Sequence, residues 1–173
     1  MQLQQTVKKC YSFEGKGLHT GRIAKMVINP APVDTGIRFR RTDIGSDAYV
    51  DALAENVTCT ARSTTISCGD ASVSTIEHVL SALTGMGVDN ALIDIDNVEV
   101  PILDGSAKPY IDAIWKDGFE QQDAPRRYVE IKETIEIRND EKGSVVRIEP
   151  AEDFSYEIKI DFNSRVIGVQ NAV

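Results

Sequence analysis

Cysteine, histidine and long apolar runs are all scarce in this chain of 173 residues. The three cysteines, Cys10, Cys59 and Cys68, are odd in number and sparse, which argues against a disulfide scaffold and favours the reducing cytoplasm. Cys59 and Cys68 stand too far apart for a Cys-x-x-Cys metal knuckle. We therefore expect both to be buried as small hydrophobic side chains. No run approaches the about 18 apolar residues of a membrane-spanning helix. Residues 1–10 are polar and lack the apolar segment of a secretion signal.

Positive charge is also in short supply, since 19 lysines and arginines face 27 aspartates and glutamates, for a net charge of −8. This balance argues against a face that binds nucleic acid. It still permits an anionic substrate where local lysines or arginines outweigh the overall sign. Hydrophobic residues make up 42% of the chain and charged residues 27%, which is typical of a soluble globular protein.

One of the only two histidines directly follows an acid, in the dipeptide Glu77-His78. The surrounding residues allow two interpretations. In the structural one, Ser74 and Glu77 form a capping box, in which each side chain satisfies a free backbone N–H at the start of a helix. In the functional one, a carboxylate and an imidazole lie side by side in a cavity. The capping signature alone favours the structural interpretation for Glu77.

The residues after this dipeptide predict a helix whose core-facing stripe has the spacing i, i+3, i+4 and i+7. The stripe consists of Ile76, Val79, Leu80 and Leu83. At about 100° per residue, His78 points almost opposite this stripe, with Glu77 and Ser81 beside it. Gly85 and Gly87 supply the C-terminal stop. Because no second histidine completes His-Glu-x-x-His, any further metal ligands come from elsewhere in the fold.

Two parts of the chain, residues 26–40 and 146–160, share one pattern of an alternating strand, an Ile-x-Pro-Ala turn and a second alternating strand. A further candidate strand precedes each, over residues 5–13 and 128–138. The similarity indicates an internal duplication, although short hairpins also resemble one another by chance.

We therefore predict an α+β fold of tandem duplicated domains, each a β-sheet with helices packed on one face. The first domain covers residues 1–118 and includes a strand at 91–95 and a second helix ending near residue 116. Residues 119–127 are predicted to form a polar linker. The second domain, residues 128–173, has its strands but no helix, so we expect it to be truncated.

Three smaller motifs each allow a structural and a functional interpretation. The glycine-rich segment 15–21 holds the other histidine, His19, and is interpreted first as a hairpin loop, because it lacks the spacing of a P-loop. Asp104-Gly105-Ser106 is expected to cap the second helix, with a catalytic Asp104 as the alternative. Lys142 lies in a predicted turn, and Asp161-Phe162 ends a strand, where the ring can stack on a base or join a core.

Four motifs in order, at residues 17–21, 74–78, 101–106 and 160–163, together resemble the UDP-3-O-acyl-N-acetylglucosamine deacetylase family. These are zinc enzymes that commit Gram-negative bacteria to lipid A synthesis, and the resemblance covers the whole chain. It implies two similar α+β domains with the active site between them. Some members of the family are fused to a 3-hydroxyacyl-carrier-protein dehydratase. The residues of this chain neither indicate nor exclude such a fusion.

The resemblance implies a role for each matching residue. His78 corresponds to a zinc (Zn2+) ligand and Glu77 to the general base. The remaining ligands, in a His-Lys-x-x-x-Asp motif, and a further catalytic histidine are absent, so we expect residues 1–173 to be inactive alone. The residues implied to contact the substrate, UDP-3-O-acyl-N-acetylglucosamine, are Leu18 and Ser63 along its passage, Lys142 near the diphosphate, and Asp161 and Phe162 at the uracil.

Cysteine is frequent in the family at the position of Ser63, so this residue departs from the common pattern. Two alternatives to the enzyme stay open. The chain could be a non-catalytic relative that binds nucleotide sugars, or a structural interaction domain in which Ser74 and Glu77 only cap a helix.

Overall fold

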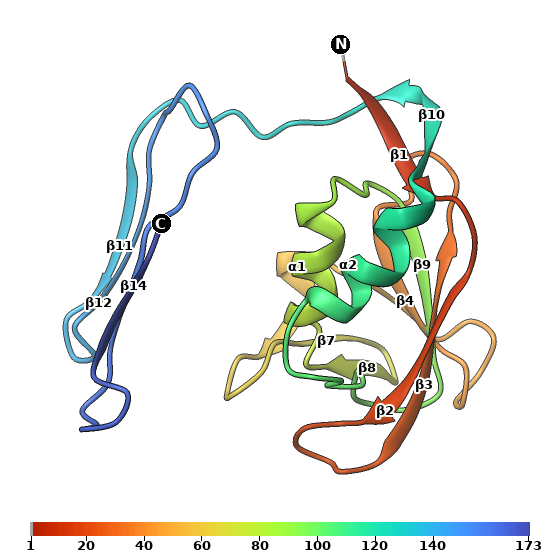
Figure 1. Cartoon of the computed structure of the whole chain (residues 1–173), viewed down its shortest axis with the longest axis horizontal. Coiled ribbons are helices and arrows are strands. Elements are labelled where there is room, and N and C mark those ends of the chain that lie inside the picture. Colours follow the sequence, from red (N-terminus) through yellow and green to blue (C-terminus); the bar gives the residue numbers. More distant parts are fainter. Residues whose placement is uncertain (1) are drawn as a thin grey trace. The chain divides into compact units, whose positions relative to one another are not determined.

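The computed structural model describes residues 2–173 and divides the chain into two compact units. The first unit ends at Arg127, and the second is Tyr128–Val173. The first unit holds both α-helices (Figure 1). It also holds every residue of the hydrophobic core.

A five-stranded sheet forms the centre of the first unit. Its strands, in spatial order, are β2 (Tyr11–Lys16), β3 (Ile23–Pro30), β9 (Ala91–Ile95), β4 (Ile37–Arg41) and β5 (Tyr49–Asp51). Neighbouring strands are antiparallel except β9 and β4, which run parallel. The strand expected at residues 91–95 is therefore present, and it occupies the middle of the sheet.

Two smaller sheets complete this unit. The three-stranded antiparallel sheet contains β6 (Val57–Cys59), β7 (Thr65–Cys68) and β8 (Ala71–Ser74), and a short 3-10 helix, η1 (Ala54–Asn56), precedes it. The two-stranded sheet pairs β1 (Leu3–Val7) with β10 (Phe119–Pro125).

Two helices, α1 (Glu77–Gly85) and α2 (Lys108–Ile114), lie side by side against the large sheet, and the 3-10 helix η2 (Trp115–Asp117) extends α2 (Figure 1). The longest of these helices has nine residues, so no helix among residues 2–173 could cross a membrane.

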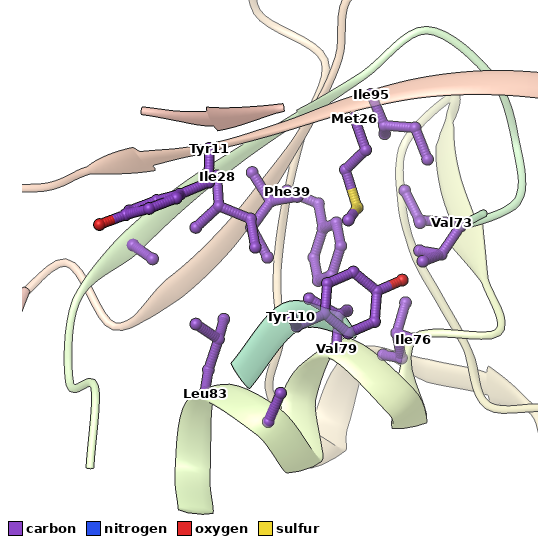
Figure 2. Packing of buried hydrophobic residues seen from close by; sticks show 14 of the residues in the cluster. Tyr11, Met26, Ile28, Phe39, Val73, Ile76, Val79, Leu83, Ile95 and Tyr110 are labelled. Atoms are coloured by element: carbon purple, nitrogen blue, oxygen red, sulfur yellow. The ribbon is translucent and has the colours of Figure 1, made fainter. Parts of the chain in front are cut away.

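The core forms between the helices and one face of the large sheet. Along β3 the buried residues alternate, with Ala24, Met26 and Ile28 facing inward, as the period of a half-buried strand requires. Figure 2 shows Met26 and Ile28 reaching toward the helices, where Val79 comes from α1 and Tyr110 from α2. The α+β class with helices on one face of a sheet is thus confirmed for the first unit.

The second unit, Tyr128–Val173, consists of two antiparallel hairpins. Its strands are β11 (Ile135–Asn139), β12 (Ser144–Ile148), β13 (Ile158–Asp161) and β14 (Val169–Ala172). Every strand residue is exposed, and residues 128–173 contain no helix. The duplication and the truncation of the second domain therefore remain predictions.

Three local expectations differ from the structure. Residues 119–127, expected as a linker, include strand β10, because its backbone groups pair with β1 despite polar side chains. The strand expected at 5–13 is two strands, β1 and β2, broken at residues 8–10. Cys59 and Cys68 are exposed rather than buried, because each lies at the end of a strand. Cys10 is exposed as well, and all three thiols are free.

Candidate active site

Helix α1 begins at Glu77 without a side-chain cap. Ile76 is the N-cap residue, and no side chain accepts a hydrogen bond there. Ser74 lies in β8, where its hydroxyl donates to the carbonyl oxygen of Val98 at 3.2 Å. The capping box is therefore wrong, because Ser74 is paired within the β structure and Glu77 is directed elsewhere.

The Glu77 carboxylate turns to a neighbouring loop instead. Its Oε2 accepts a hydrogen bond from the backbone N–H of Thr64 at 3.0 Å. Ser63, the adjacent residue, is half-buried in the same loop between β6 and β7. The structure thus places Ser63, a predicted substrate contact, beside the residue that holds the predicted base.

The two faces of α1 separate as the helical spacing predicts. Val79 and Leu83 are buried, as is Ile76 immediately before the helix. Glu77 and His78 are half-buried, and Ser81, although exposed, donates from its hydroxyl to the carbonyl oxygen of His78. Leu80 is only partly buried, so the core stripe is narrower there than expected. Within residues 2–173 the His78 imidazole has no hydrogen-bond partner, which leaves both ring nitrogens available.

The glycine-rich loop connects β2 to β3 and is fastened to a buried acid, Glu99. One carboxylate oxygen of Glu99 accepts from the backbone N–H of His19 at 2.9 Å, and the other from that of Thr20 at 2.8 Å. Leu18, the predicted substrate contact in this loop, is 58% exposed. The hairpin interpretation of residues 15–21 is therefore confirmed, and Leu18 is free to contact a ligand.

Glu99 itself is completely buried, with 0% of its surface exposed. Burial alone would raise the pKa of its carboxyl group, but hydrogen bonds from His19, Thr20 and Thr75 outweigh that effect and lower the pKa below its usual value. Glu99 was missed among the candidate site residues. The available signal was a charged residue between two valines, directly before the 101–106 motif.

The 101–106 motif forms the turn that leads into α2. Asp104 Oδ1 accepts from the N–H and the hydroxyl of Ser106, both at 2.9 Å, and these bonds lower the pKa of Asp104. The Ser106 hydroxyl oxygen in turn accepts from the N–H of Lys108 at 3.1 Å. Ala107 is the N-cap residue of α2 and no side chain caps it, so the expected capping by Asp104 and Ser106 is wrong. The two residues instead bond to each other, and Ser106 also bonds to the N–H of Lys108. The turn lies next to the glycine-rich loop, because the N–H of Ile102 donates to Lys16.

The other three candidate residues lie in the second unit. Lys142 is exposed in the turn between β11 and β12, where its N–H donates to Asn139 Oδ1 at 2.9 Å. Asp161 ends β13, and Phe162 follows it with 49% of its surface exposed. A loop bond from the Phe162 N–H to Gly168 fixes the backbone there at 3.0 Å. Asp161 and Phe162 are thus adjacent on one hairpin.

Residues 2–173 contain no group of three or more His, Cys, Asp or Glu side chains close enough to hold a metal ion. His78 offers an imidazole ligand, and the residue before it, Glu77, offers a carboxylate. These residues alone do not fit a tetrahedral zinc site, which uses at least three protein ligands.

A half-buried carboxylate and an imidazole without a hydrogen-bond partner thus follow one another at the start of α1, and a loop is bonded to the carboxylate. The chain belongs to the UDP-3-O-acyl N-acetylglycosamine deacetylase family, whose family model matches residues 4–173. The resemblance of the four motifs is thereby confirmed.

Relatives of known name agree with this family. The chain is 42% identical to a UDP-3-O-acyl-N-acetylglucosamine deacetylase from Thioalkalivibrio sulfidiphilus, with 98% of this chain and 56% of that protein covered. It is 41% identical to one from Xanthomonas oryzae, with coverage of 96% and 54%. It is also 42% identical to the bifunctional enzyme LpxC/FabZ of Porphyromonas gingivalis, covering 99% of this chain and 37% of that protein. The chain thus spans about half the length of the deacetylases that it matches.

Proposed function

We propose that the protein containing this chain removes the N-acetyl group from UDP-3-O-acyl-N-acetylglucosamine, in a zinc-dependent step of lipid A synthesis. One observation carries the proposal. Glu77 and His78 lie side by side and half-buried at the start of α1, away from the residues that the helix gives to the core. Family membership supplies the substrate class. Because the chain spans about half of its relatives, the activity is proposed for the whole protein.

Glu77 is the general base in this proposal. Water attacks the carbonyl carbon of the acetyl group, and its proton passes to the Glu77 carboxylate. The carbon–nitrogen bond then breaks, the nitrogen takes up a proton, and acetate and the free amine leave. A positioned base typically contributes about 10²- to 10⁴-fold to such a rate. The Thr64 N–H helps by holding one carboxylate oxygen in place.

His78 supplies one zinc ligand in this proposal, and the other ligands come from outside residues 2–173. Zinc, when bound, polarises the amide and makes water a stronger nucleophile at neutral pH. Because affinity for zinc is built from several placed ligands, we infer that residues 1–173 alone bind zinc weakly and have negligible activity.

We assign substrate contacts in each unit separately. Ser63 stands next to Thr64, which is bonded to Glu77, and Leu18 is exposed on the loop that is fastened to Glu99, so we assign both to the passage for the substrate. In the second unit, the exposed ring of Phe162 is available to stack on uracil, with Asp161 beside it. Lys142 is assigned to the diphosphate, because its ammonium group is exposed in a turn.

The test compares variants of the intact protein in an assay of acetate release from UDP-3-O-acyl-N-acetylglucosamine. Glu77→Gln should lower turnover by about 10²- to 10⁴-fold while bound zinc is retained. His78→Ala should lower the zinc content as well. Ser81→Ala, on the same helix face, is the matched control and should change neither. Full turnover in Glu77→Gln, or unchanged zinc in His78→Ala, would refute these roles.

The same assay separates the competing functions. A non-catalytic relative would bind the nucleotide sugar without releasing acetate, and a structural domain would do neither.

For the location, we propose the cytoplasm, because three free and exposed thiols suit a reducing compartment.

A further inference from the structure

We propose that Glu99 is a positioning residue for the deacetylase site. Its buried carboxylate fastens the glycine-rich loop to the turn that begins α1, and so sets where Leu18 lies relative to Glu77 and His78. This inference rests on the proposed function, because it concerns how the same site is assembled.

The contacts of Glu99 join two segments that are far apart in sequence. On one side, its two oxygens accept from the N–H groups of His19 and Thr20, at 2.9 and 2.8 Å. On the other side, the hydroxyl of Thr75 donates to the oxygen that His19 also uses, at 2.9 Å. Thr75 precedes Glu77 by two residues, so a single carboxylate spans from the loop of Leu18 to the start of the helix.

The backbone around Glu99 is fixed on the same side. Ser74 forms a parallel bridge with Glu99, in which the Ser74 N–H donates to Val98 at 2.9 Å and the Val100 N–H donates to Ser74 at 3.1 Å. Gly17 closes the loop against the carboxylate so tightly that a Cβ there would lie 2.3 Å from Glu99 Oε2. The position of the Glu99 side chain is therefore determined from both directions.

Thr75 adds a second indication that this turn is held in place. Its φ is 60°, a left-handed conformation that a β-branched residue rarely adopts. Such a conformation is strained and persists only where surrounding contacts enforce it. The hydrogen bond to Glu99 is one such contact. The strained turn directly precedes Ile76 and so sets the direction in which α1, with Glu77 and His78, begins.

Stability alone does not account for a carboxylate at this place. Burying an ionised carboxylate carries a large desolvation cost, and a protein with a well-packed neutral group in its place is often at least as stable. Among residues 2–173, no cation forms a salt bridge with Glu99; its partners are neutral N–H and O–H donors. A carboxylate is the side chain that can accept from all of them at once, since it has no donor of its own. The Glu99 carboxylate instead holds the glycine-rich loop and the turn before α1 in a defined relative position.

The test uses Glu99→Gln in the intact protein, with kcat and KM measured for UDP-3-O-acyl-N-acetylglucosamine. The glutamine NH2 group must face an N–H or O–H donor, so the loop loses at least one of its attachments. We expect kcat/KM to fall about tenfold or more, because small misplacements of a site carry losses up to about 10²-fold. Zinc content should not change. The amide NMR signals of His19 and Thr20 should shift, which reports directly on the attachment.

Asn90→Ala is the matched control for loss of a buried polar network. Asn90 is 1% exposed and bonds to Gly36, Gln4 and Gln122, beyond the other end of α1. It should lower the thermal stability but leave kcat/KM of the folded enzyme unchanged. An equal fall in kcat/KM for Asn90→Ala would show that the Glu99 effect is only structural and would overturn the proposal.

A milder pair of variants keeps the test decisive if Glu99→Gln does not fold. Thr75→Val removes the hydroxyl and should lower kcat/KM, whereas Thr75→Ser keeps the hydroxyl and should restore it. Normal kcat/KM in either Glu99→Gln or Thr75→Val refutes the positioning role while leaving the proposed function intact. Absence of zinc-dependent acetate release from the unmodified protein instead refutes the proposed function itself.

Discussion

The backbone N–H of Thr64 and the carboxylate of Glu77 form a hydrogen bond of 3.0 Å across 13 residues of sequence. The bond ties the loop between β6 and β7 to the first residue of α1. It also engages only Oε2, so that within residues 2–173 the other oxygen of Glu77 stays available to accept a proton. One contact thus orders a loop that carries Ser63 and orients the proposed base.

Glu77→Gln and Glu77→Ala should therefore separate the two roles of this side chain. The glutamine oxygen can still accept from Thr64, so amide hydrogen exchange at Thr64 should stay close to that of the unmodified chain. Alanine removes the acceptor, which is worth about 1 kcal/mol, so exchange at Thr64 should become roughly five- to tenfold faster. Equal exchange rates in both variants would contradict this use of Glu77.

Gly17→Ala should destabilise the first unit, because the new Cβ would lie 2.3 Å from Glu99 Oε2 and 2.6 Å from Thr20 Oγ1. Overpacking of this kind costs about 1–3 kcal/mol, which thermal or urea unfolding can measure. Gly85→Ala is the matched substitution, since nothing lies within 4 Å of a Cβ at this helical position. It should be neutral or stabilise by up to about 1 kcal/mol. A harmless Gly17→Ala would mean that the loop is looser than described.

The stability of the first unit should depend on pH through Glu99. Its pKa in the folded protein lies below the ordinary value of 4.5, so the folded state favours the ionised form. This contribution is present above the ordinary pKa and is lost as the pH falls through the lowered one. The difference in unfolding free energy between the unmodified chain and Glu99→Gln should hence shrink as the pH falls below the ordinary value of 4.5 and on through the lowered pKa. A difference that stays constant over this range would contradict the lowered pKa.

The first unit should fold without the second, because every residue of the hydrophobic core precedes residue 128. Lys132 is exposed in a segment without helix or strand, so brief trypsin treatment of the 173-residue chain should cleave there. The product ending near residue 132 should keep the melting temperature of the first unit. A loss of cooperative melting after cleavage would show that the second unit is needed for stability.

Much of the first unit could be predicted because its signals are local. The alternation of apolar residues indicated β3 and β4, a strand was also expected at β9, and the helical spacing around Val79 indicated α1. The same spacing placed Glu77 and His78 off the core stripe, as the structure has them. The prediction of a capping box at Ser74 was wrong because its hydroxyl donates to the carbonyl oxygen of Val98. No local pattern in the sequence connects these two residues. Strand β10 was missed because its residues are polar and only pairing with β1 makes them a strand.

The sequence by itself determined the α+β composition of the first unit, the helix of Glu77 and His78, and the order of the four motifs that identify the family. Periodicity and residue type suffice for these, since they act over a few neighbouring residues. Only the tertiary structure decided that Glu99 joins His19 to Thr75 and that Thr64 holds Glu77. His19 and Thr75 lie 80 and 24 residues from Glu99 in the sequence, and they reach its carboxylate because the sheets and helices pack together. No local pattern in the sequence encodes which donors this packing brings to a buried carboxylate.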